Sequence, residues 1–178
     1  MARGALDAPG TKVTAAWARL APWPFGKWLF SVMAGRTAPY TGSIGARVKQ
    51  FGDGHCVVTL RDRRAVRNHL HSVHAVALVN LAEMTSGLAM MSALPAGVRG
   101  IVTGLSIEYL KKARGTLTAE TRTTVPPVIA STDHELVATI RDSAGDEVAR
   151  ARIQWRLAPP RATVVDPPVA APLAGSAG

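Results

Sequence analysis

The sequence predicts an α+β fold in which a curved antiparallel sheet wraps around one long buried helix. Stretches of alternating apolar and polar residues, typical of strands with one buried face, lie on both sides of residues 75–94. Residues 75–94 are themselves almost entirely apolar, which is typical of a helix buried on all sides. Covering such a helix takes a large sheet, so we expect a single sheet around it.

The chain has 178 residues, of which 47% are hydrophobic, and this length is typical of one domain. We expect a flexible N-terminus over residues 1–12, one domain over 13–158 and a Pro/Ala-rich disordered tail over 159–178. The single cysteine, Cys56, excludes an intrachain disulfide, and the first residues show no secretory signal. We therefore expect a cytoplasmic protein.

The first part of the domain, residues 13–35, reads as helical material that is broken at two prolines and ends at Gly35. This segment is predicted to pack on the core. Its tryptophans, together with Arg19 and Lys27, also suit an alternative in which it lies on a membrane surface.

Strand patterns surround the central helix. Residues 44–49 and 56–61 alternate on either side of a turn and predict a hairpin. After the helix, for which Ser72 is the expected N-cap, four further strands are predicted in an antiparallel meander. In the first of them, the alternate residues from Ile101 to Tyr109 are expected to share one face. In the last, the alternate residues from Ala149 to Leu157 are expected to face the core.

The chain is basic, with 21 Lys+Arg against 12 Asp+Glu and a formal net charge of +9. The cations are dispersed and few aromatic residues accompany them, so we do not expect nucleic-acid binding. Such a field would attract a phosphate-bearing small molecule or an acidic membrane surface. Polar residues interrupt the apolar run 75–94, so we expect no integral membrane segment.

Glu83 is the most informative residue, because it is the one formally charged residue between His74 and Arg99. Burying a carboxylate costs several kcal/mol unless it is paired, hydrogen-bonded or protonated. Two interpretations stay open: a carboxylate held by structural partners, or a general base or nucleophile with a raised pKa.

The start of the helix is a second candidate site. The first N–H groups of a helix have no partners within the helix, so residues 74–76 could hold an oxyanion. His69, His71 and His74 precede or begin the helix, but their spacing relative to Glu83 matches no usual metal-ligand pattern. We therefore expect no metal and no cofactor.

The segment from Asn68 to Glu83 resembles the signature of hotdog-fold thioesterases of the PaaI-like branch, in which an Asn precedes His-Gly-Gly and a carboxylate follows on the central helix. Asn68, His74 and Ala75 fall at the family's asparagine, histidine and first glycine, and Glu83 falls at its catalytic Asp or Glu. Within that branch, the chain is most similar to relatives with His-Ala and Leu-Ala-Glu. The resemblance covers about residues 40–157 in element order.

The resemblance implies hydrolysis of an acyl-CoA thioester. The Ala75 amide would polarise the carbonyl, Glu83 would activate water or attack directly, and Asn68 would orient water or carbonyl, with His74 at the helix start. It also implies a homodimer, possibly paired into a tetramer, in which Glu83 of one subunit faces His74 and Ala75 of the other.

The basic surface would steer the phosphates of CoA, with Lys111, Lys112 and Arg114 as candidate contacts. The alternative is a non-catalytic protein of the same fold that binds an acyl group or acyl-CoA, in which Glu83 is only a structural hydrogen-bond partner.

Overall fold

The structure is a computed structural model that describes residues 9–160. Residues 1–8 and 161–178, which include most of the predicted flexible N-terminus and the predicted tail, lie outside the described residues. The first helix begins at Pro9, inside the segment predicted to be flexible. Proline fits the first positions of a helix, so a proline near the chain start does not exclude one.

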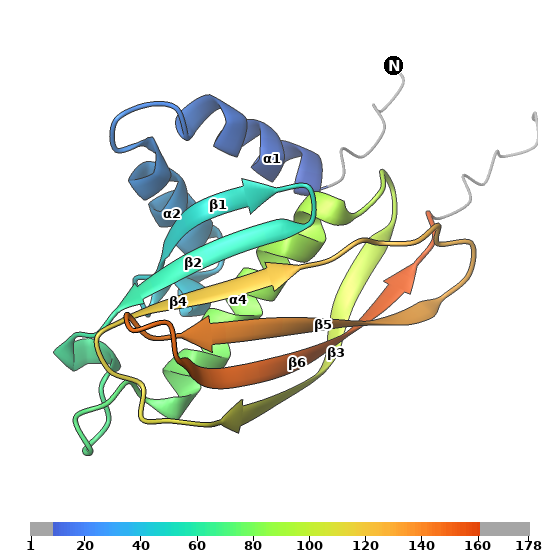
Figure 1. Ribbon diagram of the computed structural model, residues 1–178. Coiled ribbons are helices and arrows are strands. Elements are labelled where there is room, and N and C mark those ends of the chain that lie inside the picture. Colours follow the sequence, from blue (N-terminus) through green and yellow to red (C-terminus); the bar gives the residue numbers. More distant parts are fainter. Residues whose placement is uncertain (1–8, 161–178) are drawn as a thin grey trace, which may run out of the picture.

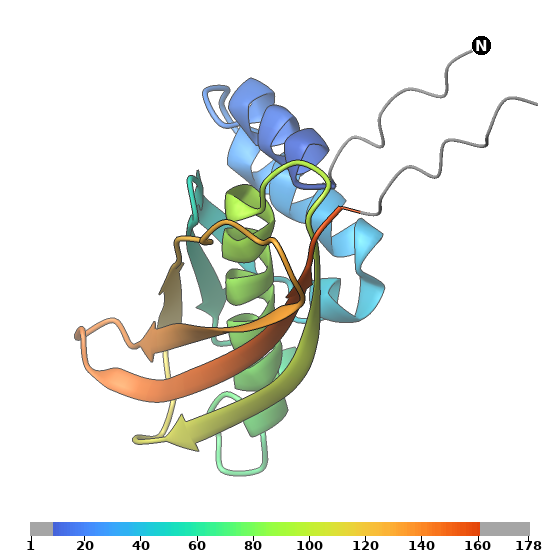
Figure 2. The same cartoon turned by 90° about the vertical axis from the view of Figure 1, so that its right-hand side faces the viewer.

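One antiparallel sheet of six strands curves around one face of a long helix, α4, and three shorter helices cover α4 from another side (Figures 1 and 2). The predicted α+β class is therefore confirmed. The helices are α1 (Pro9–Leu20), α2 (Gly26–Thr37), α3 (Pro39–Gly42) and α4 (Ala75–Ala93), with a 3₁₀ turn at Arg64–Val66. The strands are β1 (Arg47–Gly52), β2 (His55–Arg61), β3 (Arg99–Tyr109), β4 (Thr116–Arg122), β5 (Thr132–Arg141) and β6 (Glu147–Ala158).

The strand order is β1-β2-β4-β5-β6-β3, so the predicted meander is wrong for β3. This strand pairs with β6 at the edge of the sheet, and the chain then crosses to β4 in the middle. Alternation of apolar residues reveals which face of a strand is buried but not which strand lies beside it. The hairpin of β1 and β2 is confirmed.

Strand β3 also departs from strict alternation. Its pairing with β6 shifts between Val102 and Gly104, which indicates a β-bulge. The bulge puts Val102 opposite Trp155 on the inner face and leaves Ile101 66% exposed. The prediction that Ile101 shares a face with Leu105 and Ile107 is therefore wrong, whereas the inward face of β6 is confirmed.

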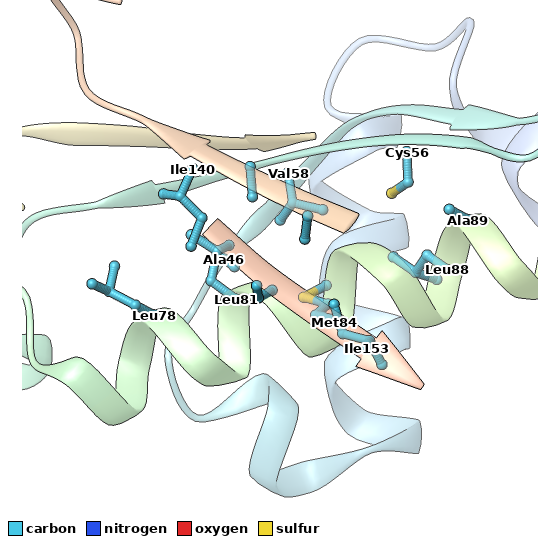
Figure 3. Packing of buried hydrophobic residues seen from close by; sticks show 14 of the residues in the cluster. Ala46, Cys56, Val58, Leu78, Leu81, Met84, Leu88, Ala89, Ile140 and Ile153 are labelled. Carbon is cyan, nitrogen blue, oxygen red and sulfur yellow. The ribbon is translucent and has the colours of Figure 1, made fainter. Parts of the chain in front are cut away.

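The core lies between α4 and the concave face of the sheet. Leucines, Met84 and alanines of α4 pack against Ala46, Val58, Ile140 and Ile153 of the strands (Figure 3). One stripe of α4 is less buried than the rest and contains Val76, Val79, Glu83, Gly87 and Met91. Within residues 9–160, α4 is the one helix long and apolar enough to span a membrane, and 61% of its apolar window is buried inside the fold, as in a core helix.

Helices α1 and α2 are fixed to the sheet by aromatic packing. The Trp17 ring stands edge-on to Phe30 at 5.0 Å and to Phe51 of β1 at 6.0 Å. The buried Ser31 hydroxyl accepts from the Val48 N–H at 2.9 Å, which covers the β1 edge of the sheet.

Helix α2 does not end at Gly35, as the sequence analysis predicted, but continues to Thr37. A Cβ at Gly35 would lie 3.0 Å from the Cα of Gly42 in α3. The glycine therefore allows two backbones to pack closely and does not stop the helix.

Candidate active site

The N-terminus of α4, which we call its entrance, is capped by His74 and not by the predicted Ser72. His74 has extended backbone angles, and its Nδ1 accepts a hydrogen bond from the Val76 N–H at 3.1 Å. Acceptance at Nδ1 places the ring proton of neutral His74 on Nε2. The Ala75 N–H, at the first helical position, donates to no residue within 9–160. It is the kind of free donor that an oxyanion site requires.

Asn68 organises the loop before this entrance. Its Oδ1 accepts from the Leu70 N–H at 2.9 Å, the Ser72 N–H at 3.3 Å and the Ser72 hydroxyl at 3.2 Å. Ser72 is thus a loop anchor, which explains why it is not the helix cap. The Asn68 NH₂ group has no hydrogen-bond partner in the described part of the chain, so one side of the amide holds the loop and the other is available to a ligand.

Asp62 connects this loop to the sheet. Its carboxylate accepts from Arg67 at 2.6 Å and from the Gly115 N–H at 3.1 Å. The Arg67 hydrogen bond is the main reason that the pKa of Asp62 is lowered. The acid therefore fixes the end of β2, the start of β4 and the loop that leads to α4.

The connection between β3 and β4 reaches the helix entrance. The Val73 N–H donates to the carbonyl of the buried Ala113 at 2.8 Å, so Lys112 and Arg114 flank a residue in contact with the entrance. The Lys111 ammonium group instead forms ion pairs with Asp142 at 2.9 Å and with Asp146 at 2.5 Å. Neither Lys112 nor Arg114 forms an ion pair with an acid in residues 9–160, although the Arg114 charge helps to lower the pKa of Asp62.

Glu83 lies on a wall of an open, mainly apolar cavity of about 400 Å³ that is lined by residues of α1, α2, α3 and α4. Burial raises the pKa of the Glu83 carboxyl, and hydrogen bonding from the Thr41 side chain acts in the opposite direction. Lys12 of α1 lines the same cavity. A carboxyl with a raised pKa inside a cavity is a candidate for acid–base chemistry.

The structure places the predicted site residues in two groups. Asn68, His74 and Ala75 lie together at the entrance of α4, whereas Glu83 follows Ala75 by eight residues on the same helix. At a rise of 1.5 Å per residue, the Ala75 N–H and Glu83 are about 12 Å apart along the helix axis. Within one subunit they cannot contact the same carbonyl group.

Sequence reasoning missed several residues around Glu83. Asn80, one turn earlier, is buried and donates to the Tyr40 carbonyl at 3.0 Å, which fixes α3 beside Glu83. Its Oδ1 is buried without a partner. Gly87, one turn later, lines the cavity. No local sequence pattern marked these residues, because the cavity forms only where α1, α2 and α3 pack against α4.

Among residues 9–160, no group of three or more His, Cys, Asp or Glu side chains is arranged to hold a metal ion. Cys56 is fully buried, and burial raises the pKa of its thiol. A buried thiol of this kind is an inert part of the core.

Solved structures with the same architecture include several thioesterases, and the fold is the hotdog fold. A genomics target of known crystal structure is 30% identical, with a TM-score of 0.73 over 84% of this chain and 97% of its own. A probable thioesterase from Pseudomonas aeruginosa is 18% identical, with a TM-score of 0.66 over 72% of this chain and 92% of its own. A hypothetical thioesterase from Streptococcus pneumoniae, solved with coenzyme A, is 22% identical, with a TM-score of 0.59 over 72% and 99%.

No curated protein matches the chain. A family model described as "Domain of unknown function (DUF4442)" matches residues 26–157, which include the whole sheet to Leu157, α2, α3 and α4. The chain therefore belongs to the DUF4442 family.

Proposed function

We propose that this protein hydrolyses acyl-CoA thioesters, as a member of the PaaI-like branch of hotdog thioesterases. The observation that carries the proposal is Glu83, a carboxyl on the wall of a mainly apolar cavity whose pKa is raised by burial. A general base is aided by a pKa closer to the operating pH.

The reaction needs a donor for the developing oxyanion, and we assign it to the Ala75 N–H. Water that gives a proton to Glu83 attacks the thioester carbonyl carbon, the C–S bond breaks, and the CoA thiolate takes the proton back from Glu83. If Glu83 itself attacks, breaking of the C–S bond leaves an acyl–Glu83 anhydride, which water then hydrolyses. The positive end of α4 stabilises the negative charge on the carbonyl oxygen. Asn68 presents its free NH₂ group to water or to the carbonyl, and no metal or cofactor takes part.

The two groups of site residues complete each other in a homodimer. Strand β3 is an 11-residue edge with one neighbour, β6, in the described sheet. Such a long unpaired edge favours pairing with a second copy. The less buried stripe of α4, with Val76, Val79 and Glu83, offers a further contact face. We propose that Glu83 of one subunit meets His74 and Ala75 of the other, and that pairs of dimers form a tetramer where they associate further.

The CoA phosphates are proposed to bind near the helix entrance. Lys112 and Arg114 flank Ala113, which bonds to Val73 directly before His74. They offer charge to phosphate groups close to the proposed oxyanion donor. Lys111 belongs to the same connection but pairs with two aspartates, so we expect it to contribute less to phosphate binding.

Release of free CoA thiol from a series of acyl-CoA thioesters tests the proposal directly, with Glu83→Gln as the matched variant. We expect turnover by the wild type and its loss in the variant. Binding of acyl-CoA by both proteins with hydrolysis by neither would instead establish the alternative, a non-catalytic acyl-binding protein.

A further inference from the structure

The cavity beside Glu83 has a direction. The α4 residues that line it are Glu83, Met84, Gly87, Leu88 and Met91, so it follows the helix from the carboxyl toward the C-terminal end. From Glu83 to Met91 the helix advances about 12 Å. The start of α1 packs against the backbone at this end, because a Cβ at Gly10 would lie 2.0 Å from the Met91 carbonyl oxygen.

The cavity walls suit an unbranched hydrocarbon. Besides Glu83, the lining residues with polar side chains are Lys12, Thr37 and Thr41, and the rest are apolar or glycine. A volume of about 400 Å³ falls in the range of small-molecule sites, which is about 300–1,000 Å³. Such a chamber favours an apolar chain over a polar or charged group.

Gly87 leaves space beside the carboxyl. A Cβ at Gly87 would meet one heavy atom within 4 Å, Glu83 Oε1 at 3.8 Å, so the position opens into the cavity beside the carboxyl. Glycine in a helix interior is destabilising relative to alanine, and the local backbone does not require it here. An unobstructed path past Glu83 accounts for its presence.

We propose, on the basis of the proposed thioesterase function, that this cavity holds the acyl chain of the substrate and that Gly87 and Met91 set its length. Carbon–carbon bonds of about 1.5 Å advance an extended chain by about 1.25 Å per carbon. A run of about 12 Å therefore takes about eight to ten carbons. The substrate class is an unbranched medium-chain acyl thioester.

Hydrolysis of acyl-CoAs from acetyl to palmitoyl tests this assignment. The wild type is expected to have its highest kcat/KM at about eight to ten carbons. Gly87→Leu blocks the path one turn beyond Glu83, so the optimum moves to about four or five carbons and kcat/KM for decanoyl-CoA falls at least about tenfold. Met91→Phe, at the far end, shortens the optimum by about two carbons. Gly87→Ala shows whether the position tolerates a side chain, since its Tm should equal or exceed that of the wild type.

Binding separates failure of the cavity from failure of the proposed function. Calorimetry with decanoyl-CoA on Glu83→Gln, and with decanoate as the product, measures occupancy without turnover. Suppose that the wild type shows no hydrolysis of any acyl-CoA, that it still binds decanoyl-CoA, and that Gly87→Leu abolishes this binding. The cavity is then an acyl-chain site in a protein that is not a thioesterase. If hydrolysis occurs and a folded Gly87→Leu keeps the chain-length preference of the wild type, the assignment is overturned. Binding of decanoate alone makes the site a fatty-acid site and overturns the thioester assignment.

A second surface adjoins that cavity and shares Met33 with it, but different observations bear on its role. The α1–α2 turn exposes Trp23 at 71% and Phe25 at 85%, and Trp28, Leu29 and Met33 of α2 continue the same apolar surface along a shallow groove that also includes Arg19. We call these five apolar residues the α1–α2 aromatic surface. Tryptophan and phenylalanine exposed together are typical of an interaction site.

The backbone holds Phe25 outward at a cost. Phe25 has φ of 64°, in the left-handed region that disfavours a bulky side chain. The neighbouring Gly26 cannot carry a side chain, because its Cβ would lie 1.7 Å from the Leu20 carbonyl oxygen. Glycine at position 25 would relieve the strain, yet the sequence places an exposed phenylalanine there.

The charge of the segment that carries this surface favours one kind of partner. Residues 8–52 contain six Lys or Arg residues and no Asp or Glu. Exposed aromatic side chains within a purely cationic segment fit the interface of an anionic lipid bilayer, where rings enter the headgroup region and cations meet phosphates. We infer that the α1–α2 aromatic surface docks on anionic membranes.

Cosedimentation of the full chain with vesicles tests this inference. Vesicles of equimolar phosphatidylcholine and phosphatidylglycerol should bind the protein, and binding should weaken as salt rises. Phe25→Gly should raise Tm and weaken binding at least about tenfold, whereas Ile129→Gly, at a residue 92% exposed in the β4–β5 connection, should leave binding unchanged. Equal binding to pure phosphatidylcholine vesicles, or undiminished binding by Phe25→Gly, overturns the inference. So does a lipid-free oligomer that Phe25→Gly dissociates, since it would assign the surface to a second copy.

Discussion

The entrance of α4 and the Glu83 face of the same helix are built in opposite ways. At the entrance, Asn68, Asp62 and His74 use hydrogen bonds to fix a loop, and the Ala75 N–H is left free. At Glu83, an acid sits against apolar walls and burial raises its pKa. One region supplies a fixed donor and the other a proton acceptor.

If the proposed hydrolysis holds, neither region is a complete site on its own. A donor without a base stabilises an oxyanion that nothing generates, and a base without a donor faces an unstabilised intermediate. The separation of about 12 Å along α4 prevents one subunit from combining them. Variants that affect one region and not the other therefore test how the two work together.

The largest effect is expected from Glu83→Gln. A general base contributes about 10²–10⁴-fold, so kcat should fall at least about a hundredfold while the fold is retained. Wild-type activity should rise with pH as Glu83 ionises, with its midpoint above the usual glutamate range because burial raises the pKa. Steady-state kinetics over pH 5 to 9 provide the measurement. Unchanged turnover in the variant would leave Glu83 a purely structural role.

Ala75→Pro removes the proposed oxyanion donor itself. Proline fits the first helical position, and His74 already has the extended backbone, with ψ of 141°, that a residue before proline prefers. The fold should survive, with kcat reduced by about 10²–10³. Ala75→Ser keeps the N–H and should stay within a few-fold of the wild type. A folded Ala75→Pro protein with full activity would show that the oxyanion donor lies elsewhere.

These two variants rest on residues that the sequence itself made visible. Glu83 is conspicuous because a charge in a long apolar run is costly, and the helix start follows from the change between alternating and continuous apolar patterns. The buried face of β6 and the β1–β2 hairpin were predictable for the same reason, since burial imposes a period of two on strands.

Other features depend on contacts between distant segments, and local patterns do not contain them. The position of β3 beside β6 and its bulge depend on pairing, not on residue period. The choice of His74 over Ser72 as helix cap depends on the use of Ser72 by Asn68. The cavity needs α1 and α2 folded over α4, so Thr41 and Gly87 acquire a role only in three dimensions.

Asn68 has two functions at the entrance: its Oδ1 holds the loop, and its NH₂ group is available to a ligand. Variants of Asn68 can separate these functions. Asn68→Asp keeps an oxygen for the Leu70 and Ser72 N–H groups but removes the free NH₂ donor, so Tm should change little and kcat should fall about tenfold, the value of one hydrogen bond of about 1.4 kcal/mol. Asn68→Ala removes both functions and should also lower stability by about 1–2 kcal/mol. Kinetics and thermal melts measure the two effects. Full activity in Asn68→Asp would limit Asn68 to holding the loop.

The smallest expected effect concerns the stability contributed by Glu83. Because burial raises its pKa in the folded state, folding favours the neutral carboxyl. Below the glutamate pKa of the unfolded chain, about 4.3, both states are protonated and there is no penalty. As pH rises through the raised pKa, the wild type loses the stability that comes from keeping this carboxyl neutral, whereas Glu83→Gln has no such group to ionise.

The Tm of Glu83→Gln minus that of the wild type should therefore grow from pH 4 to pH 8. Glu108→Gln, at an exposed carboxyl on β3, controls for the loss of one negative charge from a basic protein. The Tm difference could instead shrink as pH rises, or Glu108→Gln could show the same difference. Either result would mean that burial of ionised Glu83 does not lower the stability of the fold, and that the two regions of α4 do not differ in this respect.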